Sequence, residues 1–351
     1  MRLLLGGSPC THWSVAQTKG RETKAEGLGW ELFRNFLIAK EKFQPDFFLY
    51  ENNKSAAPAI KEQIAAELGY PLQYINSALF SAQTRHRFYV HNFGEVELPK
   101  SCDYTVADIL EQGVPYKDGK GYALDVRYYE GKQTGGLIDS SKSIRVGTVK
   151  NKKDKISTTQ SSRVFSPNGK ACTQCAGGGG MGARTGLYLC PVTEDEKVSP
   201  KYRVNGGLAE IEGIKVQLPV ADGLYAVRKL TVKEATRLQT LPDDYCKAAP
   251  SASKAYHGLG NGWTAEVIIH LLRKGLEGVD RDEELQVLSM YDGIGTGRYC
   301  LEQLGFTNVK YWAYEIEPSA IQIATSNFPD IVECGDAFAV RQSDWTLPSI
   351  R

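Results

Sequence analysis

The chain begins with an apolar strand signal that runs straight into a tight turn carrying a cysteine. Three leucines, Leu3 to Leu5, precede Gly-Gly-Ser-Pro-Cys, which ends at Cys10. A short apolar run bounded by glycine and proline is typical of a fully buried strand in an α/β sheet. A buried strand needs neighbours on both sides, and almost no chain precedes this one. We therefore expect part of its sheet to come from the other end of the sequence.

Strand and helix patterns alternate through the N-terminal part of the chain. Helical spacing of apolar residues covers residues 28–43 and 55–70, and strand patterns cover residues 45–52, 71–80 and 87–93. Strands that alternate with helices predict a parallel sheet with helices on both faces.

The segment from about 95 to 225 has a different composition, with many Gly, Ser, Thr and Lys residues and only short apolar runs. It predicts a short helix at 105–112, a glycine-rich loop at 176–186 and otherwise loops and irregular strands. The whole chain has a net charge of only +1, but residues 141–170 are strongly basic. Their charged residues are Lys142, Arg145, Lys150, Lys152, Lys153, Lys155, Arg163 and Lys170 against Asp154. This pattern fits contacts with nucleic-acid phosphates, and a solvated loop is the alternative.

Regular patterns return in the last part of the chain. Thr231 and Glu234 have the spacing of a capping box at a helix start. The expected elements are helices over 230–242 and 262–276, a charged linker over 273–284, a strand, turn and helix over 285–306, and strands over 309–318 and 330–338.

Three strand ends in this last part carry residues suited to a nucleotide-like ligand. Gly293, Gly295 and Gly297 follow a strand and open a helix, so a ligand can approach the backbone there. Glu315 ends the next strand, where a carboxylate can accept from two ribose hydroxyls, and Asp336 ends the third, where it can accept from an adenine amino group. Tight turns without a ligand are the alternative.

Polar side chains also mark strand ends in the N-terminal part. Cys10 follows its strand at the edge where α/β proteins place nucleophiles, although most intracellular cysteines are inert core residues. Glu51 lies in a strand that otherwise reads as buried, where an ionisable group is costly. Gln83, Arg85 and Arg87 alternate and therefore point to one face. The two arginines could instead pair with surface carboxylates.

Together these motifs closely resemble those of the DNA cytosine-5 methyltransferases, over most of the chain outside residues 95–225. GGSPC, YEN and QTRHR resemble the family's Pro-Cys, Glu-Asn and Gln-x-Arg-x-Arg motifs. LTVKEATRLQTLPDDY resembles the helix that supports the recognition domain, and GLGNGWTAEV the motif that closes the cofactor pocket. YDGIGTG, YEIEP and GDAF resemble the three S-adenosylmethionine motifs. YDGIGTG and GWT are similar to the subgroup that includes vertebrate de novo enzymes and many phage enzymes.

The resemblance implies an α/β fold, a Rossmann-like sheet that binds S-adenosylmethionine, with a smaller irregular target recognition domain at 95–225. The catalytic part would comprise residues 1–94 and 226–272, and the cofactor-binding part residues 285–351, beyond the linker. Residues 11–29 match the family's mobile loop that closes over DNA.

The activity implied by the resemblance is transfer of a methyl group from S-adenosylmethionine to carbon 5 of a cytosine flipped out of double-stranded DNA. Cys10 would attack carbon 6, which requires neighbours that lower the pKa of its thiol. Glu51 would hydrogen-bond ring nitrogen 3, Arg87 would hold the carbonyl oxygen of the base, and Arg85 would support them or contact phosphate. A DNA-binding homologue without turnover and an RNA methyltransferase are the alternatives.

The cofactor contacts implied by the resemblance come from the three S-adenosylmethionine motifs and the pocket-closing motif. They are Tyr291, Asp292, Gly293, Ile294, Gly295, Thr296, Glu315, Ile316, Asp336, Ala337, Asn261, Gly262 and Trp263. The ring of Trp263 would line the methionine side of the cofactor pocket or pack in the core.

The order of the motifs departs from the family pattern. In the usual members the cofactor motifs come first and Pro-Cys follows, whereas here the cofactor motifs occupy residues 287–339. Joining Arg351 to Met1 would restore the familiar order. We therefore interpret the chain as a circularly permuted member of the family, which is tolerable when the cut falls in a surface loop.

The cysteine content and the hydropathy point to an intracellular protein. Eight cysteines without a secretory signal or a long apolar run indicate reduced thiols, and we expect a cytoplasmic monomer in a bacterial or phage-infected cell, with no membrane association. Cys172, Cys175 and Cys190 suggest zinc, but a structural site needs a fourth ligand and none is suitably spaced, so we expect no metal.

Overall fold

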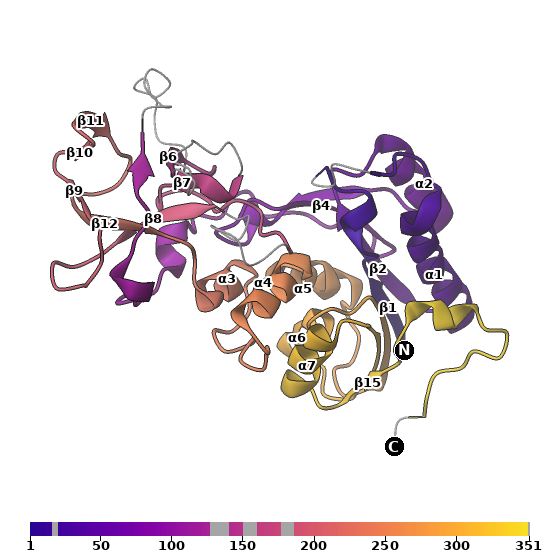
Figure 1. Ribbon diagram of the computed structural model, residues 1–351. Coiled ribbons are helices and arrows are strands. Elements are labelled where there is room, and N and C mark those ends of the chain that lie inside the picture. The colour runs from indigo at the N-terminus through magenta and orange to yellow at the C-terminus, as the bar shows by residue number, and fades with distance from the viewer. Residues whose placement is uncertain (16–19, 127–139, 150–159, 177–185, 350–351) are drawn as a thin grey trace.

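A seven-stranded sheet forms the centre of the larger part of the protein (Figure 1). The computed structural model describes residues 1–15, 20–126, 140–149, 160–176 and 186–349. The strand order is β15-β14-β13-β1-β2-β4-β3. The strands are β1 (Arg2–Gly6), β2 (Phe47–Asn53), β3 (Gln73–Asn76), β4 (His86–His91), β13 (Leu285–Met290), β14 (Val309–Tyr314) and β15 (Ile331–Glu333). All neighbouring pairs from β15 to β2 are parallel, whereas β4 runs antiparallel to both β2 and β3.

The first strand of the chain lies in the middle of this sheet. β1 pairs in parallel with β13 on one side, with Arg2 opposite Gln286, and with β2 on the other, with Leu3 opposite Phe47. The expectation that the opening strand takes a partner from the far end of the sequence is therefore confirmed. The backbone N–H of Gln286 also donates to the carbonyl of Met1 at 2.9 Å, so the pairing extends to the first residue.

Helices cover both faces of the sheet, as the alternating pattern predicts. Leu4 packs with α1 (Gly27–Phe43) and α2 (Pro58–Leu68) on one face. Leu3 and Leu5 point the other way, toward α5 (Ala265–Gly275), α6 (Thr296–Gln303) and α7 (Pro318–Asn327). The helix α7 was not predicted from the sequence. None of the helices in the described part of the chain has the length and apolar character that a bilayer-spanning segment requires.

The middle segment forms a second sheet with a core of its own, at the left of Figure 1. The sequence predicts loops and irregular strands here. The strands are indeed short, but they pair into one ordered sheet, which was not predicted because strands this short show no clear period. The six strands are β5 (Leu124–Asp125), β6 (Arg145–Val149), β7 (Arg163–Phe165), β8 (Leu187–Pro191), β12 (Gly223–Arg228) and β9 (Tyr202–Val204), with a hairpin of β10 (Leu208–Ile211) and β11 (Ile214–Gln217) beside them. β12 continues past the boundary expected at residue 225.

Buried charged side chains join the middle segment to the elements before and after it in the chain. Arg228 at the end of β12 donates twice to Glu234, at 2.7 Å each, and Glu234 also completes the predicted capping box of α3 (Val232–Leu238) with Thr231. Lys170 is only 2% exposed and donates to the carbonyls of Ser81, Cys102 and Tyr104 at 2.6–2.9 Å.

The basic stretch at 141–170 is therefore only partly a surface feature. The expectation that Lys170 contacts phosphate is wrong, because its ammonium group is buried among backbone carbonyls. Lys150, Lys152, Lys153 and Lys155 lie outside the described residues. The short helix expected at 105–112 is a 3-10 turn at Val106–Ile109.

Candidate active site

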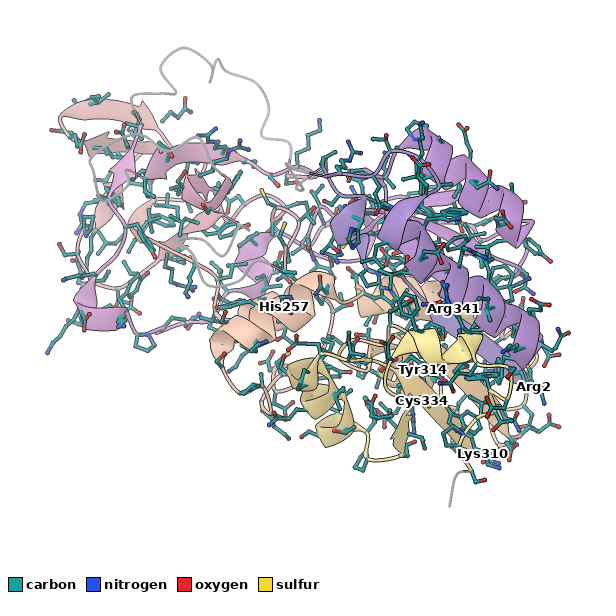
Figure 2. All side chains as sticks on the ribbon, turned by 45° about the vertical axis from the view of Figure 1, so that its right-hand side comes forward. Arg2, His257, Lys310, Tyr314, Cys334 and Arg341 are labelled. Carbon is teal, nitrogen blue, oxygen red and sulfur yellow. The ribbon has the colours of Figure 1, made fainter. Side chains whose placement is uncertain are left out.

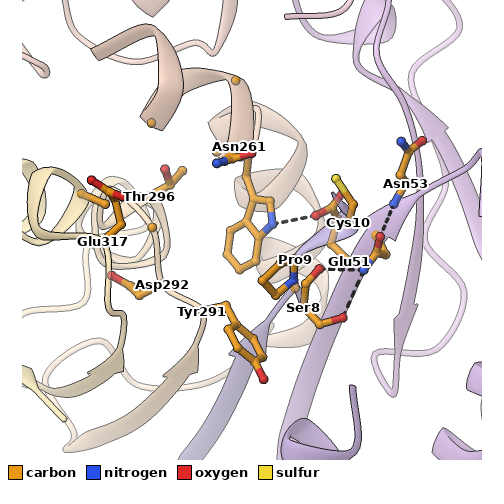
Figure 3. A pocket seen from close by; sticks show the side chains of 18 of the residues that line it. Ser8, Pro9, Cys10, Glu51, Asn53, Asn261, Tyr291, Asp292, Thr296 and Glu317 are labelled. Carbon is orange, nitrogen blue, oxygen red and sulfur yellow. Dashed lines mark hydrogen bonds between the residues drawn. The ribbon is translucent and has the colours of Figure 1, made fainter. Parts of the chain in front are cut away.

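A pocket opens where the carboxyl ends of the central strands meet (Figure 3). Cys10, Glu51, Arg85 and Arg87 line it from the N-terminal part of the chain. From the C-terminal part it is lined by Tyr291, Asp292, Gly293, Thr296 and Glu315. The end of α4 (Ala252–Asn261) and the turn after it contribute Asn261, Gly262 and Trp263. Because β1 and β13 are neighbours, residues from the two ends of the sequence share one cavity.

The turn that carries Cys10 is fixed from below by polar side chains of β2. Asn52 donates its Nδ2 to the carbonyl of Ser8 at 2.8 Å, and the hydroxyls of Tyr50 and Ser8 are 2.7 Å apart. Cys10 then begins a short 3-10 turn, and the N–H groups of Trp13 and Ser14 donate to its carbonyl. The backbone of the cysteine is thus held in place, and its side chain is left in the pocket.

The resemblance implies neighbours that lower the pKa of the Cys10 thiol, but in the structure this pKa is raised. Burial raises the pKa of the thiol and Glu51 adds to the rise, while Arg87 and Arg85 lower it by less. The two arginines supply the expected positive neighbourhood, but burial outweighs them. In the form described here Cys10 is a thiol at neutral pH.

Glu51 is held by two donors, one on each carboxylate oxygen. Arg87 Nε lies 3.0 Å from Oε1, with both side chains 11% exposed, and Trp263 Nε1 donates to Oε2 at 3.0 Å. Burial raises the pKa of Glu51, and Arg87, Arg85 and the Trp263 hydrogen bond oppose that rise. The group is therefore poised to take up a proton more readily than an exposed glutamate.

Arg85 was expected either to support Glu51 and Arg87 or to contact phosphate, and the structure does not place it at the surface, where phosphate would bind. It is 2% exposed and donates to the carbonyls of Gln174, Gly260 and Gly262 at 2.8–3.0 Å, so a phosphate contact is excluded in this conformation. Gln83 is also buried, and its Oε1 accepts from the N–H of Gln174 at 2.8 Å. Both side chains tie the middle segment to the pocket.

The glycine-rich turn after β13 is built around the carboxylate of Glu315. Gly293 and Gly295 have φ of 67° and 79°, which favours glycine. Glu315 accepts from the N–H of Gly293 at 2.9 Å and from those of Ile316 and Glu317 at 2.8 Å. The sequence motif of glycines and a following acid is thus one physical unit.

Two buried polar atoms at this turn have no partner within the described residues. They are Oδ2 of Asp292 and Oγ1 of Thr296. Tyr311 donates to the other oxygen of Asp292 at 2.6 Å, and burial raises the pKa of Asp292 to about 6. These two oxygen atoms in the pocket wall are open to hydrogen bonds from a bound ligand or from water.

Several of the expected cofactor residues do not line this pocket. Ile294 is 1% exposed in the core, so its side chain is not available to a ligand. Ala337 is also buried, Ile316 is 68% exposed, and Asp336 caps the short helical turn that follows it by accepting from Phe338 N at 2.9 Å. Gly295 contributes through the shape of the turn.

The segment after Cys10 is anchored at both ends. Trp13 is fully buried and donates to Glu22 Oε2 at 3.0 Å, while Oε1 of Glu22 accepts from Gly29 N at 3.1 Å. Residues 16–19 of the expected loop at 11–29 lie outside the described residues.

Two titratable residues that line the pocket, His257 and Glu317, were not among the site residues expected from the sequence. His257 lies on α4, between the helices predicted at 230–242 and 262–276, where none was expected (Figure 2), and Glu317 lies just before α7. Lys254 Nζ lies 2.8 Å from Glu317 and, with Ser319, lowers the pKa of that carboxyl to about 2. Lys254 and His257 are three residues apart, the spacing of neighbours on one face of a helix, and this spacing was the signal in the sequence that could have indicated α4.

The cysteines considered for zinc sit separately from this pocket. Cys190 is buried, and burial raises its pKa to about 12, while Cys172 Sγ lies 3.7 Å from the hydroxyl of Ser143. Across the described ranges, no three His, Cys, Asp or Glu side chains are grouped as metal ligands.

The sequence is similar to known methyltransferases. A family model described as C-5 cytosine-specific DNA methylase matches residues 1–276. The orphan methyltransferase M.SPRI of Bacillus phage SPR is 32% identical over 124 residues, which are 32% of this chain and 28% of that protein. The type II methyltransferase M.HhaI of Haemophilus parahaemolyticus is 26% identical over 77% of this chain and 73% of its own length.

Further matches have lower identity. The type II methyltransferase M.SsoII of Shigella sonnei is 25% identical over 79% of this chain and 64% of its own length, so the chain spans less than two thirds of M.SsoII and of M.SPRI. A crystal structure of a Spodoptera frugiperda DNMT2 mutant superposes with a TM-score of 0.42 at 13% identity, covering 78% of this chain and 79% of the other.

Proposed function

This chain belongs to the C-5 cytosine-specific DNA methylase family, and we propose that it transfers a methyl group from S-adenosylmethionine to carbon 5 of a cytosine flipped out of double-stranded DNA. The observation that carries the proposal is the shared pocket. A thiol, a buried glutamate with a raised pKa and an arginine paired to it face the glycine-rich turn and its unsatisfied polar atoms across one cavity.

The residues of the N-terminal part fit covalent activation of the base. The thiolate of Cys10 forms a bond to carbon 6, and the displaced electron pair moves into the ring at carbon 5. A proton on Glu51 shared with ring nitrogen 3 stabilises the charge that builds up, and Arg87 keeps the carboxyl in place. Protonation of Glu51 also removes a negative charge that raises the pKa of Cys10, so binding of the base favours the thiolate.

The residues of the C-terminal part fit S-adenosylmethionine. Asp292 and Thr296 have buried oxygen atoms without partners among the described residues, and Glu315 directly follows β14 and lines the same pocket. Asp292, Thr296 and Glu315 would hold the cofactor, with Tyr291 and Gly293 beside it. When bound, S-adenosylmethionine supplies an electrophilic methyl group. Once carbon 5 carries the methyl group, loss of its proton to solvent and departure of Cys10 from carbon 6 as a thiolate would restore the double bond of the ring.

The middle segment would recognise the DNA. Its sheet stands beside the pocket on its own core, and Arg85 and Gln83 connect its residue Gln174 to the site. Exposed basic side chains on such a module suit phosphate contacts, and the remaining surface would read base edges.

We also infer that the chain is circularly permuted relative to its relatives. The strand that precedes Cys10, β1, lies between β13 and β2, and the family match stops at residue 276, before the glycine-rich turn begins. A rearranged gene that places residues 285–351 and a flexible linker before Met1 tests the inference. The rearranged chain is expected to fold and to retain activity, and a chain that cannot fold in that order contradicts it.

Bisulfite sequencing of DNA from cells that express the protein tests the activity and reports the target sequence. Protected cytosines at a defined sequence context are expected, and their absence in cells with a Cys10→Ser variant is the control. Labelled-methyl transfer to DNA and to tRNA, run in competition, separates the two substrate classes. Methyl incorporation into tRNA alone, or into neither, contradicts the proposal.

A further inference from the structure

Trp263 lies against both halves of the pocket. Its indole Nε1 donates to Glu51 Oε2 at 3.0 Å, one of the contacts dashed in Figure 3. The other end of the ring lies against the first turn of α6, where a Cβ placed on Gly297 would be 3.6 Å from Trp263 Cζ3. One aromatic side chain therefore contacts the acid beside Cys10 and the helix that follows the glycine-rich turn.

The surrounding chain is built to allow this contact. A Cβ on Gly7 would lie 3.2 Å from Glu51 Oε2 and 3.5 Å from Trp263 Nε1, so the glycine leaves the space that the hydrogen bond occupies. The backbone on either side of the tryptophan is also fixed. Arg85 donates to the carbonyl of Gly262 at 2.8 Å, and the hydroxyl of Thr264 donates to Gln239 Oε1 at 2.9 Å.

We propose that Trp263 is a positioning residue that orients Glu51 toward the flipped base, and that it makes this orientation sensitive to occupancy of the S-adenosylmethionine side of the pocket. This inference rests on the proposed function. The indole N–H of Trp263 and the Nε–H of Arg87 can act only as hydrogen-bond donors. Each therefore fixes one carboxylate oxygen of Glu51 as an acceptor. A proton on Glu51 must then occupy one of the lone pairs that remain. Because the far end of the ring lies at the cofactor helix, a ligand packed there restricts the same indole.

The test follows the protonation of Glu51 through the reactivity of Cys10, without turnover. Since the Glu51 charge raises the pKa of Cys10, the rate of Cys10 alkylation by iodoacetamide has an inflection where Glu51 titrates. Mass spectrometry of the peptide that contains Cys10 separates its alkylation from that of the other cysteines. The measurement is made from pH 4.5 to 9, with and without S-adenosylhomocysteine.

The indole N–H stabilises the charged form of Glu51, and Trp263→Phe removes this donor. The inflection in the alkylation rate is therefore expected to move upward by about one pH unit. Replacement of Trp263 by β-(3-benzothienyl)alanine keeps the ring shape without the N–H and is expected to give the same shift. In the unmodified protein S-adenosylhomocysteine is expected to move the inflection downward, and in both variants this response is lost.

Equal inflections in all three proteins overturn the inference. A shift in the Phe variant alone also overturns it, because the ring would then act only through packing. If the unmodified protein transfers no methyl group to any DNA, the proposed function fails while the alkylation readout remains interpretable. The two failures are therefore distinguishable.

Discussion

Removal of Arg87 is expected to make the stability of the protein depend steeply on pH. The Arg87→Met variant leaves the carboxylate of Glu51 without the partner that lies 3.0 Å away, in a site where both side chains are 11% exposed. A buried charge that loses its ion-pair partner costs about 3–5 kcal/mol, and the lower end of that range applies here because Trp263 and Arg85 still stabilise the carboxylate. The folded protein can avoid this cost by keeping Glu51 protonated, which becomes harder as the pH rises above the ordinary pKa of 4.5.

The size of the stability loss is limited by the free energy needed to keep Glu51 protonated in the folded protein. Each pH unit above the ordinary pKa adds about 1.4 kcal/mol to the cost of keeping the proton. The free energy of unfolding is therefore expected to fall by at most about 1.4 kcal/mol at pH 5.5 and by about 3 kcal/mol at pH 7. The sign follows from linkage. A folded-state pKa raised further means that the folded protein binds more protons than the unfolded chain, so stability declines with rising pH.

Urea unfolding of both proteins at pH 5.5, 7 and 8.5 measures this difference. The matched control is the double variant Glu51→Gln with Arg87→Met, which has no charge to leave unpaired and is expected to recover most of the lost stability at pH 7 and above. A loss of stability that is the same at all three pH values would refute the reasoning. A double variant as unstable as Arg87→Met alone would do so too.

Three further changes have defined outcomes. Cys10→Ser is expected to abolish methyl transfer while DNA binding in a gel-shift assay is kept, and undiminished turnover removes Cys10 from the mechanism. Lys170→Met leaves three backbone carbonyls without their donor and is expected to lower the free energy of unfolding by about 3 kcal/mol, measured in urea against Lys247→Met at an exposed site. The carboxyl of Asp292 has a pKa of about 6, so the unmodified protein is expected to bind the cationic S-adenosylmethionine roughly tenfold more tightly at pH 7 than at pH 5. Asp292→Asn removes this carboxyl and is expected to abolish the gain, measured by calorimetry. An unchanged gain contradicts the role of Asp292.

The central sheet was largely predictable from the sequence because its strands and helices have clear periods. The run at Leu3 to Leu5 predicts a buried strand, and its pairing with β13 follows from the motif order. The second sheet was not predictable in the same way. Strands such as Leu124–Asp125 and Arg163–Phe165 are too short for alternation to be visible, and their pairing depends on contacts distant in sequence.

The sequence predicted only part of the set of residues that line the pocket, and it predicted few of the contacts between them. Cys10, Glu51, Arg85 and Arg87 do line one pocket with Asp292 and Glu315. The sequence cannot say that burial outweighs the arginines at Cys10, that Arg85 binds three carbonyls, or that the indole of Trp263 reaches Glu51. Each of these depends on distances between segments that meet only in the folded chain.

The position of β1 also has a consequence during synthesis. The N-terminal amino group of Met1 donates to the carbonyl of Glu284, 283 positions along the chain, and β1 lies beside the strand that follows it. At translation rates of about 5–20 residues per second, the apolar strand waits roughly 15–60 s on the ribosome before its neighbour emerges. During that time one edge of Leu3 to Leu5 has no native partner. Newly made chains are therefore expected to depend on chaperones that shield apolar segments until synthesis is nearly complete.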